Sequence, residues 1–126
     1  MAGGRELHRR RFKELVLYAS ERAADHPRFG STKLNKILFF SDFEAYLRLG
    51  RSITGAEYQK LKRGPAARMF PVLVGEMESD REIEIVRRKV IDYYEEVPVL
   101  KESRPNPSVF TEEERANHRR SDRHSS

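Results

Sequence analysis

The sequence predicts a mainly α, α+β fold: a small helical domain with a central buried helix and a short β-hairpin. Two stretches in the first half of the chain repeat apolar residues with the period of an α-helix. A later stretch is rich in β-branched and aromatic residues, which favours strands. The length of 126 residues suits one domain.

The first helix is expected over residues 9–25, because apolar residues recur at i, i+3, i+4 and i+7 from Phe12 onward and Pro27 follows. The second is expected over residues 33–49, with Ser31-Thr32 as its N-cap and Gly50 as its C-cap. This second helix is apolar on two sides, so it is expected to be the central one. The two apolar stripes are Leu34, Ile37, Leu38 and Ala45, and Phe39, Phe43, Tyr46 and Leu47.

The middle of the chain mixes turn signals with helix signals. Residues 51–65 are expected to form a connector with a turn at Thr54-Gly55 and a short extended segment at 57–62. A third helix is expected to open at Pro65 or the residue after it and to run to about residue 78. Because Pro71 lacks an N–H group, it should kink or restart that helix.

The last third predicts a hairpin and a capped helix start. Residues 82–100 are expected to form two short strands or one hairpin, with the basic residues Arg87, Arg88 and Lys89 near its tip. Thr111, followed by three glutamates, is typical of a helix N-terminus.

The net charge of +5 belongs to the ends of the chain. Residues 1–13 carry five basic and one acidic residue and residues 115–126 carry four and one, which leaves residues 14–114 at −2. We expect a flexible basic N-terminus over 1–10, a folded domain over 11–114 and a disordered basic tail over 115–126. That tail has no apolar periodicity, which suggests a C-terminus truncated or frameshifted against its relatives.

The chain offers no catalytic pattern. It has no Cys, HExxH motif, GxSxG elbow or P-loop. The histidines at positions 8, 26, 118 and 124 lack metal-ligand spacing. Asp42 and Glu44 are two residues apart and therefore point to different faces of their helix. We expect a non-enzymatic binding protein without cofactor or metal; the absence of a signal peptide or membrane-spanning apolar run favours the cytoplasm.

Two classes of macromolecular partner remain. One class is nucleic acid, whose phosphates could be bound by the basic residues of the hairpin and by a second basic cluster near a turn, Lys60, Lys62 and Arg63. Such binding would suit a DNA-binding regulator of its own operon. Against this, the middle of the domain is net acidic. A protein partner is the reading that we favour, because Phe40, Tyr46 and Tyr58 could form an apolar patch. We expect Phe39 and Phe43 to lie in the core.

The segment KLNKILFFSDFEAYLRLGRSITGAEYQKLKRGPA, residues 33–66, resembles the Panacea domain found in SocA-like antitoxins and in phage-associated proteins of the GepA type. The shared features are the Lys-Leu-x-Lys helix with Phe39, Phe40 and Asp42, then Gly50, Ile53-Thr54-Gly55, Tyr58 and Gly64-Pro65. Lys62-Arg63 stands where the family has Pro-His, and Ser52 replaces a proline.

The resemblance implies a mostly helical fold with a small hairpin, and no enzymatic activity or cofactor. It also implies a role in a bacterial toxin–antitoxin system, as an antitoxin that binds and neutralises a toxin encoded by an adjacent gene. A degraded remnant without function is a third possibility, suggested by the tail. The predicted partner-binding residues are Lys36, Phe40, Tyr46, Tyr58, Lys62, Arg63, Gly64 and Pro65.

Overall fold

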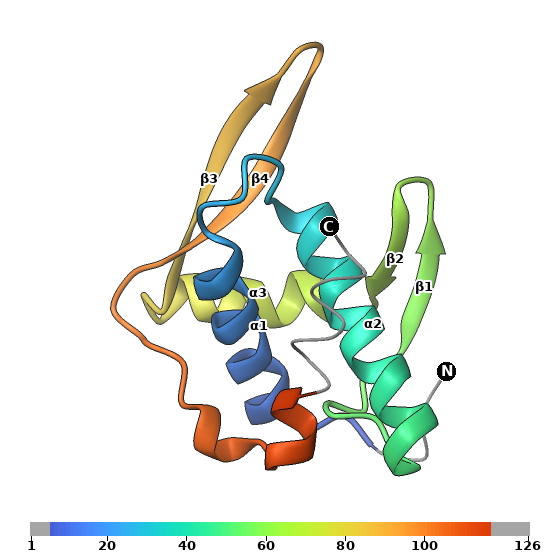
Figure 1. The fold of residues 1–126 in the computed structure, drawn as a ribbon. Coiled ribbons are helices and arrows are strands. Elements are labelled where there is room, and N and C mark those ends of the chain that lie inside the picture. Colours follow the sequence, from blue (N-terminus) through green and yellow to red (C-terminus); the bar gives the residue numbers. More distant parts are fainter. Residues whose placement is uncertain (1–5, 117–126) are drawn as a thin grey trace.

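The computed structural model describes residues 6–116, which form an α+β fold with two separate two-stranded antiparallel sheets (Figure 1). In chain order the elements are α1 (Arg9–Ala23), α2 (Ser31–Leu49), β1 (Tyr58–Leu61), β2 (Gly64–Ala67), α3 (Phe70–Ser79), β3 (Ile83–Val90), β4 (Tyr93–Leu100) and the 3₁₀ helix η1 (Pro107–Val109). Residues 112–116 are also helical.

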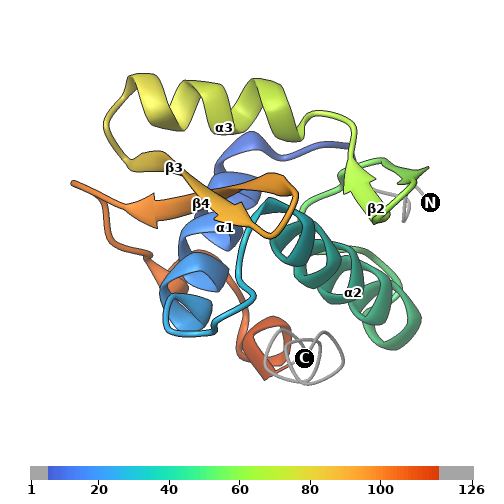
Figure 2. The same cartoon turned by 90° about the horizontal axis from the view of Figure 1, so that it is seen from above.

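The central helix of the domain is α1. It contacts α2, α3, β4 and η1, and Figure 2 shows it beneath the β3–β4 hairpin with α3 on one side and α2 on the other. Phe12, Leu15, Val16 and Ala19, the predicted apolar positions, are all buried. The expectation that α2 is the central helix is wrong, because only one of its two apolar stripes is covered by neighbouring elements.

The start of α2 is capped from outside the helix. The N-cap residue is Gly30, which has no side chain to offer, so the prediction of a Ser31-Thr32 cap is wrong. Instead, the backbone N–H of Thr32 donates to Oε1 of Glu95 on β4 (3.1 Å), and the Ser31 hydroxyl donates to a hairpin carbonyl. The predicted C-cap is confirmed: Gly50 is left-handed (φ 81°), and its N–H donates to the Tyr46 carbonyl.

Gly30→Ala is expected to lower the free energy of unfolding by about 1–3 kcal/mol, because a Cβ atom at this buried position would overlap Cγ and Oε1 of Glu95. Gly75→Ala in α3 is the matched control, since its Cβ would meet no atom within 4 Å. That change should stabilise the helix by about 0.5–1 kcal/mol. Urea denaturation of both variants checks the contrast, and equal midpoints would contradict the close packing of Glu95 on Gly30.

Residues 64–67 form a strand rather than a helix start. Gly64 reverses the chain at φ 133°, and β2 then pairs with β1 in the register Tyr58↔Ala67 to Leu61↔Gly64. The N–H of Ala67 donates to Oδ1 of Asn35 on α2, which anchors β2 to that helix. The predicted helix opening at Pro65 is therefore wrong. The helix begins at Phe70, with Pro71 in its first turn, so Pro71 acts as the restart that the sequence allowed.

The predicted hairpin over residues 82–100 is confirmed as β3 and β4, paired from Ile83↔Leu100 to Val90↔Tyr93. It projects beyond the helices (Figure 1). Arg87, Arg88 and Lys89 lie within β3 and pair with β4, so they flank the tip at residues 91–92 without forming it.

The predicted helix start at Thr111 is confirmed as a capping box. The Thr111 hydroxyl accepts the N–H of Glu114 (3.1 Å), and the Thr111 N–H donates to Oε1 of Glu114 (2.9 Å). Residues 1–5, half of the predicted flexible N-terminus, and residues 117–126, most of the predicted tail with two of the histidines, lie outside the described residues.

Candidate partner-binding site

A buried carboxylate ties the chain after α2 back onto that helix. Asp42 is fully buried, and its Oδ1 accepts the backbone N–H groups of Ile53 (2.8 Å) and Thr54 (2.9 Å). Its Oδ2 accepts the hydroxyls of Thr54 (2.5 Å) and Tyr58 (2.7 Å). Burial raises the pKa of Asp42, although the hydrogen bonds from Thr54 and Tyr58 act in the opposite direction. In the sequence, Asp42 was considered for catalysis and as part of the family motif, and this structural role was missed.

The turn that Asp42 holds is also braced internally. The N–H of Gly55 donates to the Ser52 hydroxyl (3.0 Å), and the N–H of Ala56 donates to Oγ1 of Thr54 (3.1 Å). Gly55 has φ 74°, which a glycine adopts without strain. The predicted turn at Thr54-Gly55 therefore has a defined shape and leads directly into β1.

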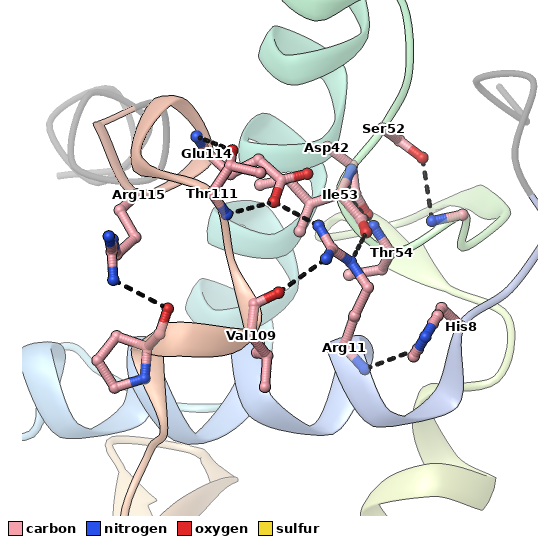
Figure 3. Close-up of polar contacts among 12 residues, drawn as sticks. His8, Arg11, Asp42, Ser52, Ile53, Thr54, Val109, Thr111, Glu114 and Arg115 are labelled. Atoms are coloured by element: carbon pink, nitrogen blue, oxygen red, sulfur yellow. Dashed lines mark hydrogen bonds and ion pairs between the residues drawn. The ribbon is translucent and has the colours of Figure 1, made fainter.

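The C-terminal segment, residues 107–116, is held against the same turn by Arg11 of α1 (Figure 3). Its Nε donates to the Ile53 carbonyl (2.7 Å), one terminal nitrogen donates to the Val109 carbonyl (2.8 Å), and the other forms an ion pair with buried Glu114. The guanidinium also lies 5.6 Å from the centre of the Phe110 ring. Arg11 and Glu114 were not predicted to act together, although the capping pattern at Thr111 included Glu114.

One side of α2 carries a partly exposed aromatic face, which we define as Phe40, Phe43, Tyr46 and Leu47. The Phe39 and Phe43 rings stack at 5.7 Å between centroids, and Phe39 meets Phe40 and Tyr58 edge to face. Phe39 is half-buried, whereas Phe43, Tyr46 and Leu47 are 37%, 41% and 65% exposed. Neither Phe39 nor Phe43 belongs to the buried core, so the expectation that both lie in it is wrong.

A second surface feature is a groove of about 700 Å³ at the start of α2. Its walls come from the loop between α1 and α2, the first turns of α2, the β1–β2 turn and the β3–β4 hairpin. The Arg63 guanidinium lies over the Tyr93 ring at 4.0 Å and so links the two hairpins. We call this the basic groove, after the Lys and Arg residues that line it: Arg28, Lys33, Lys36, Arg63, Arg88 and Lys89.

The family description "Antitoxin SocA-like, Panacea domain" matches residues 34–117. The match covers two thirds of the chain, from α2 through the Asp42 turn and both hairpins to the capped helix start. The chain belongs to the Panacea domain family. The resemblance seen in the sequence is thus confirmed. No curated protein and no solved structure matches the chain.

The Panacea domain distributes the eight predicted partner-binding residues over four places. Lys36 and Arg63 line the basic groove, and the Lys36 side chain passes over Gly64, where a Cβ atom would lie 3.0 Å from its Cε. Phe40 and Tyr46 belong to the aromatic face. The hydroxyl of half-buried Tyr58 turns inward to Asp42.

The other two predicted residues of the Panacea domain lie at the β1–β2 turn. Lys62 is exposed in the turn itself, and Pro65 is half-buried on β2 opposite Lys60. Arg88 and Lys89 join the groove from β3, although the sequence placed their basic run near the hairpin tip, apart from Lys62 and Arg63.

Two further properties of the described residues bear on the class of site. Over residues 6–116, no three His, Asp or Glu side chains are grouped so that they could hold a metal ion. Within the same range, no helix has the length and apolar character needed to cross a membrane.

Proposed function

We propose that this Panacea-domain protein is an antitoxin that binds and neutralises a cognate toxin protein encoded by an adjacent gene, and that it acts by binding rather than by catalysis. Membership of the SocA-like antitoxin family supports the antitoxin role in general. The observation that carries the protein-binding proposal is the aromatic face of α2.

The aromatic face has the properties of a contact surface for a protein. Phe43, Tyr46 and Leu47 are spaced i, i+3 and i+4, so they form one continuous apolar stripe on the outside of the helix. Aromatic residues are enriched in protein interfaces because they bury much area with little loss of side-chain entropy. The ion pair between Arg48 and Glu44 on the same helix (3.9 Å) supplies a polar rim.

The support beneath this face is rigid. Phe39 packs between Phe43 and Tyr58, and Tyr58 is hydrogen-bonded to buried Asp42. A face held in this way presents its side chains to a partner without having to order them first, which lowers the entropic cost of binding.

The combined change Tyr46→Ala and Leu47→Ala is expected to weaken toxin binding at least about tenfold, since interface aromatics commonly contribute more than about 1 kcal/mol each. Tyr46 is 41% and Leu47 is 65% exposed, and neither belongs to the buried core, so the melting temperature should stay close to that of the wild type. The measurement is co-purification of the toxin with tagged antitoxin, together with rescue of growth during toxin expression.

Val72→Ala provides the matched control for this prediction. Val72 is an apolar side chain on α3 with 50% exposure, and its loss should leave both readouts unchanged. If the Tyr46/Leu47 double variant neutralised the toxin as well as the Val72 variant, the aromatic face would not be the contact surface.

A further inference from the structure

The basic groove gathers positive charge from four parts of the fold. Six Lys and Arg side chains line it, and Glu95 is the single carboxylate among its lining residues. The start of α2 lies between the two hairpins (Figure 1), so its first-turn backbone and the positive end of its dipole face the same space. The groove therefore favours anionic groups.

The surroundings of the groove limit the size of its ligand. Residues 6–116 carry 21 Lys and Arg residues against 19 Asp and Glu residues, a net charge of +2; without the six groove cations the rest of the domain has a net charge of −4. A long polyanion such as a nucleic acid strand would run from the groove onto repulsive surface. A volume of about 700 Å³ holds a few side chains. Both facts favour a short anionic segment.

The groove already holds one carboxylate of its own chain. Oε1 of Glu95 accepts the Thr32 N–H (3.1 Å), and Oε2 lies 3.6 Å from the Arg63 guanidinium. Arg88 is also engaged, because it donates to the Phe29 carbonyl (2.9 Å). Within residues 6–116, in contrast, Lys36 and Lys89 have no ion-pair partner, so their ammonium groups can pair with carboxylates from outside.

We propose that the basic groove binds an acidic segment of the toxin, a short stretch with several Asp or Glu side chains, with Lys36 and Lys89 as its principal contacts. The proposal rests on the proposed function and adds the chemistry of the partner to it. The aromatic face would contribute apolar contacts. The groove would favour partners with negative charge and would fix how the toxin is positioned on the antitoxin.

A fluorescein-labelled deca-glutamate peptide tests the groove directly on the full-length protein by fluorescence anisotropy, with labelled deca-glutamine and a labelled ten-nucleotide poly-dT strand as comparisons. Deca-glutamate should bind at 50 mM salt and weaken as salt rises, whereas deca-glutamine should not bind. The pair Lys36→Gln and Lys89→Gln should weaken binding about tenfold, because each lost ion pair is worth up to about 1 kcal/mol.

The matched control is the pair Lys60→Gln and Lys101→Gln, which removes the same charge from strand β1 and from the end of the hairpin without touching the groove. It should change affinity less than twofold. If the Lys36/Lys89 double variant shows no cooperative thermal unfolding and is therefore not folded, the double variant Arg28→Gln and Lys89→Gln is used in its place. The proposal is overturned if deca-glutamate does not bind, or if the Lys60/Lys101 pair loses as much affinity for it as the Lys36/Lys89 pair. It is also overturned if poly-dT binds more tightly than deca-glutamate and the Lys36/Lys89 pair abolishes that binding, which would identify a nucleic-acid site.

Growth rescue separates this proposal from the function on which it rests. Loss of neutralisation in the Lys36/Lys89 variant, with retention in the Lys60/Lys101 variant, supports the groove as part of the toxin interface. Full neutralisation by the Lys36/Lys89 variant overturns that role and leaves the proposed function intact. Failure of the wild type to neutralise contradicts the proposed function, and the peptide titration then decides on its own whether the groove binds carboxylates.

Discussion

Asp42→Ala is expected to lower the free energy of unfolding by about 3–5 kcal/mol, because two backbone N–H groups and two hydroxyls lose their acceptor in a site without solvent access. Domains of this size have a total stability of only about 5–15 kcal/mol, so the variant should lie close to its folding threshold. Urea denaturation followed by circular dichroism measures the loss.

Asp42→Asn is the matched control for this change. The amide keeps the shape of the side chain, and its oxygen can still accept both backbone N–H groups. Its NH₂ group cannot accept from the hydroxyls of Thr54 and Tyr58, so a smaller loss of about 1–2 kcal/mol is expected. If the alanine and asparagine variants were equally stable, the hydrogen bonds to Asp42 would not hold the turn.

The same network has a pH signature. Since burial raises the pKa of Asp42 above its ordinary value of 3.8, the folded state binds this proton more readily than the unfolded chain does. The contribution of Asp42 to stability therefore declines as pH rises above 3.8, and Asp42→Asn removes that decline. Glu76 acts in the opposite sense, because hydrogen bonds from Lys13 and Arg9 lower its pKa. Its effect is the same in the wild type and in Asp42→Asn, so the difference between their curves of stability against pH isolates Asp42.

At the alkaline end the network involves Tyr58. Burial, followed by the nearby Asp42 charge, raises the pKa of Tyr58 well above 10.0. The unfolded chain therefore loses this proton first, so stability falls as pH rises above 10. Tyr58→Phe should remove that part of the alkaline loss.

Arg11→Met is expected to cost about 3–5 kcal/mol, because it leaves the Glu114 carboxylate, which is 1% exposed, without its counter-ion. The carbonyls of Ile53 and Val109 also lose their donors. The C-terminal segment should detach first, since Arg11 joins it to α1 and to the Asp42 turn (Figure 3). Limited proteolysis within residues 103–116, alongside thermal denaturation, measures both effects.

Arg10→Met is the control for this second change. Arg10 is 65% exposed, and its partner Glu14 (3.1 Å) is buried but keeps a second hydrogen bond, from the Asn106 N–H (2.8 Å). The loss of Arg10 should therefore cost about 1–2 kcal/mol, less than the loss of Arg11. The combined change Arg11→Met and Glu114→Leu should recover part of the stability, because it removes the uncompensated buried charge. Equal melting temperatures for the Arg10 and Arg11 variants would show that the buried pair does not secure the segment.

The sequence by itself determined the features that depend on neighbours along the chain. The period of apolar residues identified α1 and α2, and the β-branched run identified the β3–β4 hairpin. Gly50 and Thr111 marked helix ends correctly, because a cap is made by residues within one turn of it. The order and spacing of the α2 and turn motifs also indicated the Panacea family.

Only the tertiary structure decided which surfaces are covered. Residues 64–67 became a strand because β1 and Asn35 offered partners that the local helix signal at Pro65 could not match. The cap of α2 comes from Glu95, 63 residues away from Thr32. The basic groove likewise unites Lys36, Arg63 and Lys89 from three elements. Such contacts depend on how elements pack together, and packing is a property of the whole domain rather than of any short segment.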